Sequence, residues 1–494
     1  MVTTTLTALT LEMVILTPIA REPAGVVLYT LPQNLLPTKN LKREVKEEDV
    51  FLHLSSFINV SIMKWSLYNE IIDSSYNKDI AYIYNIRYDL VYTIDRTLVA
   101  ILQKYHKNIE NLENIHPDFY RSMIDNKLIV ENNIDEYQEC LNDITTRLKS
   151  DKSVRITVNP TLDCNLKCWY CYENHTKGSF INQDIINRIC LYLQNVISSP
   201  TNEKVQLSFF GGEPLLCFSR CMKPLIDRFN TICSCHKKQL SFSITTNGVC
   251  LTKNTVDELL SYGQKVYIQV AFDGNREAHN KIKFLKSGEG VYDIVRNNLY
   301  YALEKGLIVT IRCNYDAMTI LSFINLLEDF QNYWNFPNLR FDFHRIWQTD
   351  VDNKLFERLA KFKESVKGFN FKSNLPTYRG NSATYCACDY DNNFIFNYDG
   401  NIYKCTARDF TSENKIGFLD LDGNIIITAN KTFEKFTEEC THCRFLPLCT
   451  ICTKVRSESK NGKCPGIDSK AENISLNIRK HFYDKFILPN KLNI

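Results

Sequence analysis

The sequence predicts an α/β fold, a partial (β/α)6 barrel, in the middle of the chain. Between Arg155 and Trp347, apolar β-rich runs alternate with segments of helical period. The six predicted strands are 154–158, 205–210, 240–245, 266–272, 307–312 and 339–346. The segment 181–197 carries apolar residues at steps of three and four, as crossover helices on a parallel sheet do. In such folds, chemistry is expected at the carboxyl ends of the strands.

The chain is long enough for two or three domains, which its local patterns delimit. Residues 1–62 show no sustained period, and we expect a poorly structured, dispensable extension with Met63 as the natural start. Strands at 80–86, 90–94 and 128–130 with helices at 95–105 and 118–126 favour a winged-helix-like module, although an ordinary packing domain fits the pattern equally. The predicted domains are 63–150 (module), 151–347 (core), 348–380 (linker), 381–470 (cysteine-rich domain) and 471–494 (tail).

Charge and cysteine content narrow the class of protein. The formal net charge of +3 is too balanced to indicate binding to nucleic acid or to a membrane surface. No apolar run reaches the roughly 20 residues of a membrane span, and no secretory signal is recognisable. Nineteen cysteines without a secretory signal indicate metal or redox chemistry in a reducing, cytoplasmic setting rather than disulfides.

Three cysteines share one short loop after the first predicted strand of the core. Cys164, Cys168 and Cys171 offer three thiolates, which select a soft metal. A structural zinc site closes with four protein ligands, and His175 is the only close candidate for a fourth. An iron–sulfur cluster with one iron left open fits three cysteines better, because the open iron can bind a small molecule.

The spacing Cys-x3-Cys-x2-Cys, with the aromatic Tyr170 before the third cysteine, resembles the signature of the radical S-adenosylmethionine superfamily. This resemblance implies a [4Fe-4S] cluster whose open iron binds S-adenosyl-L-methionine. It also implies reductive cleavage of that cofactor to a 5′-deoxyadenosyl radical, and a radical SAM barrel as the core fold.

Further motifs at the ends of predicted strands resemble the cofactor-binding motifs of the same superfamily. They comprise Gly211, Gly212, Glu213 and Pro214 after the second strand, Asn247 after the third, and Asp273 after the fourth. Alone, the first of these would be read as a turn. Ala271 stands where the family has a serine, and Lys283 where it has an arginine that holds the cofactor carboxylate. Lysine lacks the bidentate fork, so Arg312 at the fifth strand end is the alternative, unless it is a surface charge.

Eight cysteines form a second group near the C-terminus, and they resemble the auxiliary-cluster domain called SPASM. By this resemblance, one auxiliary [4Fe-4S] cluster is held by Cys440, Cys443, Cys449 and Cys464, and a second by Cys386, Cys388, Cys405 and Cys452. Either Cys386 or Cys388 could be a bystander, and the spacing before Cys452 departs from the family pattern. A pair of tetrahedral zinc sites is the alternative for the same thiolates.

The resemblance is greatest to maturases of ribosomally synthesised peptides. It implies a precursor peptide as substrate, bound by the N-terminal module at a sheet edge, and an electron donor such as flavodoxin or ferredoxin. No catalytic side chain is assigned. The alternatives are an anaerobic sulfatase-type protein maturase and a non-catalytic zinc- or cluster-binding interaction protein.

Overall fold

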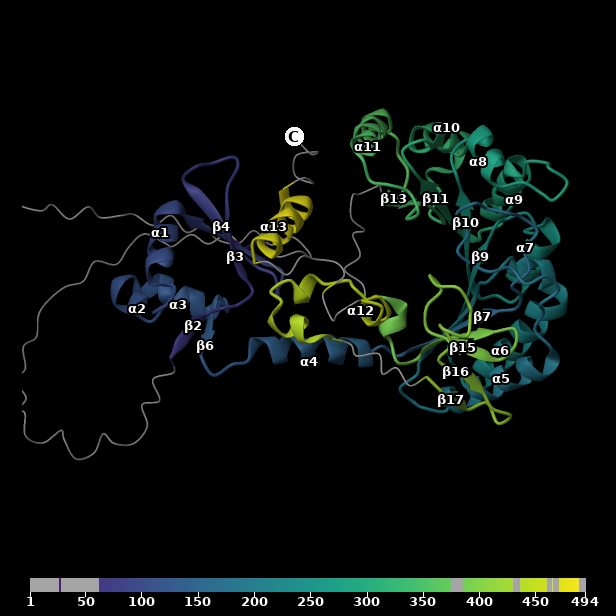
Figure 1. Ribbon diagram of the computed structural model, residues 1–494, viewed down its shortest axis with the longest axis horizontal. Helices are drawn as coiled ribbons and strands as arrows, with labels where there is room; N and C mark the ends of the chain where they lie inside the picture. The colour runs from purple at the N-terminus through teal and green to yellow at the C-terminus, as the bar shows by residue number, and fades with distance from the viewer. Residues whose placement is uncertain are drawn as a thin grey trace, which may run out of the picture. The chain divides into compact units, whose positions relative to one another are not determined.

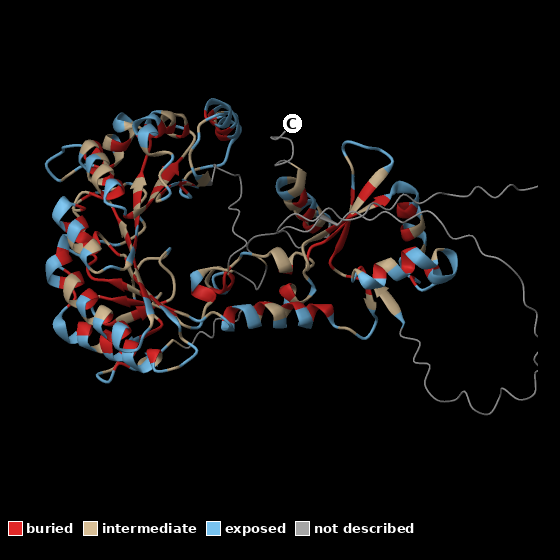
Figure 2. Cartoon of the chain, turned by 180° about the vertical axis from the view of Figure 1, so that it is seen from behind, coloured by how far each residue is buried: buried red, intermediate tan, exposed pale blue. Residues whose placement is uncertain are grey.

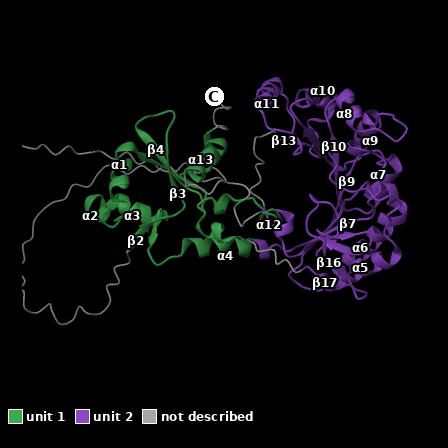
Figure 3. Ribbon diagram, viewed as in Figure 1, with its two compact units in different colours: residues 1–147, 435–451, 455–494 green, residues 148–434, 452–454 purple. Residues whose placement is uncertain are grey.

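The computed structural model describes residues 62–374, 385–429, 436–459, 464 and 471–487, and the backbone of Val26–Val27. The chain forms two compact units by its contacts (Figure 3). Unit 1 comprises residues 1–147, 435–451 and 455–494, and unit 2 comprises residues 148–434 and 452–454. None of the described helices combines the length and apolar character that a membrane span requires.

Unit 2 is organised around an eleven-stranded sheet in the order β13-β12-β11-β10-β9-β8-β7-β14-β15-β16-β17 (Figure 1). Six strands that are consecutive in the chain lie side by side and run parallel. They are β7 Ser153–Asn159, β8 Lys204–Phe209, β9 Gln239–Thr246, β10 Lys265–Phe272, β11 Ile308–Tyr315 and β12 Leu339–Arg345. All six predicted strands are therefore present, and the predicted parallel α/β core is confirmed.

Helices connect these strands and cover one face of the sheet. They are α5 Gln183–Ile197, α6 Lys223–Cys235, α7 Lys253–Ser261, α8 Arg276–Ile282, α9 Tyr292–Glu304 and α10 Phe323–Asp329. Figure 2 shows their buried residues turned toward the sheet and their exposed residues turned away. The Asn182 side chain caps α5 by accepting a hydrogen bond from the Ile185 N–H at 2.9 Å. The buried face of α5 agrees with the apolar period predicted for residues 181–197.

The remaining strands of unit 2 extend the sheet at both ends. Next to β7 lies β14 Asn393–Asn397 in parallel, followed by the antiparallel strands β15 Asn401–Tyr403, β16 Gly417–Leu419 and β17 Ile425–Ile427. At the other end, β13 Ser373–Asn374 pairs with β12. The stretch predicted as a linker, residues 348–380, contains α11 Asn353–Ser365 as well as β13, so part of it is regular structure.

Unit 1 contains the N-terminal module. Its main sheet has the order β1-β5-β4-β3, and a second sheet pairs β2 with β6. The strands are β1 Val26–Val27, β2 Met63–Trp65, β3 Asn69–Asp73, β4 Ile80–Asn85, β5 Leu90–Asp95 and β6 Ile129–Glu131. The helices are α1 Arg96–Tyr105, α2 Asn111–Ile115 and α3 Pro117–Asp125. The predicted strands and helices of the module are present, and its winged-helix character stays a prediction.

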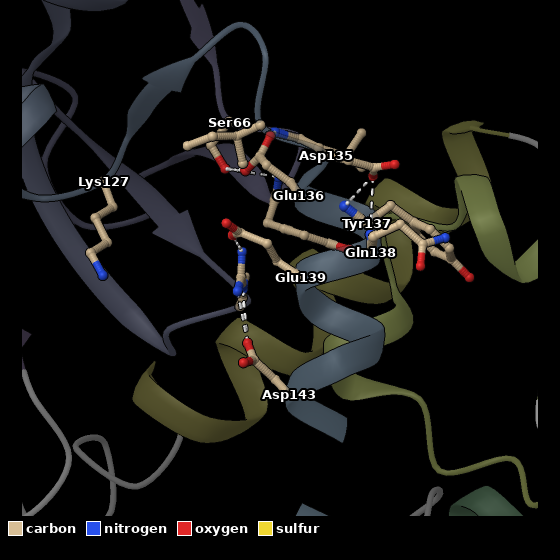
Figure 4. A network of polar contacts seen from close by, with 12 residues as sticks. Ser66, Lys127, Asp135, Glu136, Tyr137, Gln138, Glu139 and Asp143 are labelled. Atoms are coloured by element: carbon tan, nitrogen blue, oxygen red, sulfur yellow. Dashed lines mark hydrogen bonds and ion pairs between the residues drawn. The ribbon is translucent and has the colours of Figure 1, made fainter. Parts of the chain in front are cut away.

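Helix α4, Glu136–Lys149, is held to the module by a polar network (Figure 4). Asp135 accepts hydrogen bonds from the first turn of the helix, at 3.1 Å from the Tyr137 N–H and 3.0 Å from the Gln138 N–H. Glu136 accepts from the Ser66 hydroxyl at 2.5 Å and from the Leu67 N–H at 2.8 Å. These contacts fix where the chain leaves the module.

The C-terminal part of the chain contributes short helices to unit 1. They include η6 Glu438–His442, η7 Leu446–Leu448, α13 Ala471–Phe482 and η9 Tyr483–Ile487, while α12 Thr453–Ser457 begins at residues grouped with unit 2. Glu70 of β3 is buried and receives ion pairs from Arg444 at 2.9 Å and Arg479 at 2.8 Å. The segment predicted as a tail therefore includes a helix that packs on the N-terminal module. Of residues 1–62, all but Val26–Val27 and Ile62 lie outside the described residues.

Candidate cofactor and metal site

The predicted cofactor residues of unit 2 meet at the carboxyl ends of the parallel strands. The cysteine loop follows β7, the Gly211–Pro214 segment follows β8, Asn247 follows β9 and Asp273 follows β10. Parallel strands end at the same edge of a sheet, so residues far apart in sequence become neighbours there.

The Gly211–Pro214 segment lies directly against the cysteine loop. The Glu213 N–H donates to the Asp163 carbonyl at 2.8 Å. A Cβ added at Gly212 would lie 2.1 Å from that same carbonyl oxygen, and Gly211 has φ +83°. Only glycine permits this approach of the two backbones, which explains both glycines physically.

Glu213 is fully buried, and three donors surround its carboxylate. The Leu215 N–H lies at 3.0 Å, the Thr246 hydroxyl at 2.7 Å and the Asn247 N–H at 2.7 Å. Burial raises the pKa of Glu213 to about 7, although the hydrogen bonds favour the ionised form. A buried carboxylate of this kind is suited to receive a cationic ligand.

Asn247 connects the end of β9 to the cysteine loop. Its side-chain amide donates to Asn165 Oδ1 at 2.8 Å and lies 3.9 Å from Cys164 Sγ. Asn165 was not singled out from the sequence, because an asparagine between two cysteines carries no signal of its own. The contact holds the first cysteine in place.

The three cysteines of the loop are suited to a cluster rather than to a single ion. Burial raises the pKa of the Cys164 thiol to about 12 and of the Cys171 thiol to about 11, so a bound metal must supply the charge that keeps them deprotonated. His175 Nε2 lies 3.6 Å from Cys171 Sγ. Even so, these four residues do not bring their ligand atoms within 4.8 Å of one another, as the ligands of one ion would.

Tyr170, Asp273 and Lys283 form one buried network. The Tyr170 hydroxyl donates to Asp273 at 2.6 Å and accepts from the Lys283 ammonium at 2.7 Å, and Lys283 also forms an ion pair with Asp273. Burial opposes the charge on Lys283, but attraction to Asp273 and Tyr170 raises its pKa overall. Lys283 therefore stays cationic at the position where the family has arginine.

Arg312 lies on β11 beside this network. Its Nε donates to Asn314 Oδ1 at 3.0 Å, and Asn314 in turn donates to the Tyr170 hydroxyl at 3.1 Å. Burial lowers the pKa of Arg312, which is only partly offset by Tyr172, Tyr170 and Asp342. The cofactor role of Arg312 therefore stays a prediction.

Glu173 is a site residue that the sequence analysis missed. It follows the third cysteine by two positions, and burial raises its pKa to about 7 while the Gly212 N–H donates to it. Its Oε2 is buried without a hydrogen-bond partner among the described residues. Its place two positions after Cys171 was the signal by which the sequence could have indicated this residue.

Four of the C-terminal cysteines line one cavity of about 260 Å³ within unit 1. They are Cys440, Cys443, Cys449 and Cys464. Arg456 Nη2 donates to Cys449 Sγ at 3.4 Å, and Glu439 accepts from the Cys464 N–H at 2.6 Å. The cavity and its four thiols fit the predicted auxiliary cluster, which binds through four cysteines.

The other four C-terminal cysteines lie in unit 2. Cys386, Cys388 and Cys452 come together, and their sulfur atoms all lie within 4.8 Å of one another. Cys405 is not part of this compact group, and its sulfur accepts a hydrogen bond from the Ala407 N–H at 3.4 Å. Cys405 therefore stays a predicted ligand.

Comparison with known families decides the identity of the central domain. Residues 158–328, which include the cysteine loop and the three strand-end motifs, match the profile of the Radical SAM superfamily. The chain contains a radical SAM domain. This confirms the superfamily predicted from the cysteine spacing, and the family implies binding of S-adenosylmethionine and a [4Fe-4S] cluster.

Relatives of the radical SAM domain differ in what they do. "Radical SAM cyclopropyl synthase TigE" of Paramaledivibacter caminithermalis is 22% identical over 260 residues, 45% of this chain and 52% of that protein. "Fe-coproporphyrin III synthase" of Methanosarcina barkeri is 26% identical over 188 residues, 37% of this chain and 43% of that protein. The chain thus spans about half the length of these curated relatives.

A solved structure shares the fold over a longer stretch. Native anSMEcpe with bound AdoMet and Cp18Cys peptide aligns with a TM-score of 0.51 at 18% identity, covering 69% of this chain and 98% of that chain. At this identity, the likeness supports the fold alone.

Proposed function

We propose that the chain is a radical SAM enzyme that modifies a ribosomally synthesised precursor peptide. The observation that carries the first half is the convergence of three cysteines, Glu213 and Asn247 at one sheet edge inside the radical SAM domain. When bound, the cluster and S-adenosylmethionine supply a 5′-deoxyadenosyl radical by reductive cleavage. We also propose a cytoplasmic location, because a reducing compartment keeps the predicted cluster-binding thiols free.

The residues of the chain have separate parts in this proposal. Cys164, Cys168 and Cys171 hold the cluster, and the Glu213 carboxylate binds the cofactor ammonium. Lys283 and Arg312 supply positive charge for the cofactor carboxylate, and the Tyr170 hydroxyl holds Lys283 in place. Glu213 and Lys283 are buried and held by hydrogen bonds, which would keep them oriented toward the cofactor.

A peptide substrate is supported by two observations. The solved structure of anSMEcpe, which shares the fold, has a peptide bound. The N-terminal module has β3 as an outer strand of its sheet, to which an extended peptide could add beside the positions where Arg444 and Tyr483 already donate to the Asn69 and Asp73 carbonyls. We further propose an auxiliary cluster on Cys440, Cys443, Cys449 and Cys464, and a small reduced donor such as flavodoxin or ferredoxin as the source of electrons.

The test is turnover of a candidate peptide. A short peptide encoded beside this gene is incubated anaerobically with the cluster-loaded chain, S-adenosylmethionine and a reductant, and followed by mass spectrometry. We expect a change in peptide mass that matches 5′-deoxyadenosine in amount, and none with the same peptide lacking its N-terminal half. Modification of a folded protein partner instead, with the peptide unchanged, would contradict the peptide assignment.

A further inference from the structure

The compact group of three cysteines in unit 2 differs from the other cysteine sites. Cys386, Cys388 and Cys452 bring their sulfur atoms within 4.8 Å of one another, and no other described group of three or more His, Cys, Asp or Glu residues does so. Cys388 and Cys452 are each 7% exposed. The site is therefore both tight and largely shielded from water.

The surrounding contacts hold these three cysteines in place. Cys386 and Cys388 flank the start of a 3-10 turn, η5 Ala387–Asp389, in which the Asp389 N–H donates to the Cys386 carbonyl at 2.9 Å. Asp389 Oδ1 accepts hydrogen bonds from Thr453, at 2.8 Å from its N–H and 2.6 Å from its hydroxyl. The residue next to Cys452 is thus tied to the turn that carries the other two thiols.

The size of the group distinguishes a single ion from a cluster. Thiolates on one tetrahedral ion, at about 2.3 Å from it, lie roughly 4 Å from one another. In a cubane each thiolate binds its own iron, so the sulfur atoms stand farther apart. The same chain provides the comparison, because Cys440, Cys443, Cys449 and Cys464 line a cavity of about 260 Å³ and do not form such a tight group.

We propose that Cys386, Cys388 and Cys452 bind one thiophilic metal ion, Zn²⁺, instead of a third cubane cluster, and that Cys405, the remaining predicted ligand of this set, closes the site as the fourth ligand. One residue separates Cys386 from Cys388, and the fold brings both sulfur atoms to that of Cys452. Residues 452–454 are the part of the last 60 residues that groups with unit 2, so the ion fastens this short segment to the turn at 386–389. This proposal rests on the proposed function, in which two cubane clusters use seven other cysteines: Cys164, Cys168, Cys171, Cys440, Cys443, Cys449 and Cys464.

The experiment is a metal count on the full-length chain, produced with both iron and zinc available and purified without oxygen. Wild-type protein is expected to hold about eight iron atoms, in two cubanes, and about one zinc. Cys386→Ser/Cys388→Ser/Cys452→Ser is expected to lose the zinc and keep its iron. The matched control, Cys440→Ser/Cys443→Ser/Cys449→Ser, is expected to lose about four iron atoms and keep the zinc.

Three results would overturn the proposal: about twelve iron atoms in the wild type, loss of about four from the first variant, or wild type without zinc. If the first variant does not fold, zinc X-ray absorption of the wild type decides, with sulfur neighbours at about 2.3 Å expected. Zinc neighbours that are mainly nitrogen or oxygen would contradict the site. Absent 5′-deoxyadenosine with the zinc site intact would count against the proposed function alone.

Discussion

Replacing Gly212 by alanine probes the close contact on which the cofactor site depends. The added Cβ would lie 2.1 Å from the Asp163 carbonyl oxygen and 2.7 Å from the Asp163 and Leu162 carbonyl carbons. All three are backbone atoms, so no side chain can turn away. The Gly211–Pro214 segment and the cysteine loop must then separate by about 1 Å, which weakens the 2.8 Å hydrogen bond from the Glu213 N–H to Asp163.

We expect two consequences of Gly212→Ala. Overpacking lowers the free energy of unfolding by about 1 to 3 kcal/mol. A displacement of about 1 Å between Glu213 and Cys164 lowers the rate of 5′-deoxyadenosine formation about 100-fold. The assays are thermal unfolding and chromatography of the nucleoside product, with iron content measured on the same samples.

The matched control is Gly306→Ala. Gly306 has a positive φ, +92°, which Gly212 does not have, and nothing lies within 4 Å of the added Cβ. We expect backbone strain to lower the free energy of unfolding of this variant by roughly 1 kcal/mol, with no change in its rate of 5′-deoxyadenosine formation. Wild-type rate and iron content in Gly212→Ala would refute the proposed contact between the two loops.

Three further predictions concern charge. Burial raises the pKa of Glu213 to about 7, above the ordinary 4.5, so the folded chain without cofactor loses stability as pH rises from about 4.5 to about 7. The affinity for S-adenosylmethionine should rise over the same range, because Glu213 ionises near pH 7. Calorimetry on Glu213→Gln should show weaker binding that does not depend on pH. Lys283→Met leaves the Asp273 carboxylate buried without its cation and should lower the free energy of unfolding by about 3 kcal/mol. Adding Asp273→Asn should recover part of this loss. An unchanged melting temperature in Lys283→Met would contradict the ion pair. Arg456→Gln removes a charged hydrogen-bond donor from Cys449. In an EPR-monitored titration it should lower the reduction potential of the auxiliary cluster proposed on Cys449 and its three partner cysteines by about 60 mV, whereas the cluster on Cys164 keeps its potential.

The sequence predicted the elements whose signal is local. The six strands of the core were recognisable because each is a continuous apolar run, and the cysteine loop because its spacing is itself the motif. The strand-end motifs could be placed together because parallel strands end at one edge.

Contacts between distant segments were not predictable in this way. The grouping of Cys440 with the N-terminal module depends partly on ion pairs such as Arg444 with Glu70, which are 374 positions apart. The hydrogen bond from Lys283 to the Tyr170 hydroxyl spans 113 positions. Neither pair leaves a periodic pattern along the chain, so the pairing was not predictable, although the motifs had singled out Tyr170 and Lys283 individually. The ion pair between Arg479 of α13 and Glu70 of β3 is likewise not visible along the chain.

The most direct test of the central claim is 5′-deoxyadenosine formation by the anaerobic, reduced chain with S-adenosylmethionine. We expect product from the wild type and from Cys235→Ala, which alters an exposed cysteine outside the proposed sites. We expect none from Cys164→Ala/Cys168→Ala/Cys171→Ala, together with a loss of about four iron atoms per chain. Undiminished product from this triple variant would contradict the assignment of the radical SAM site.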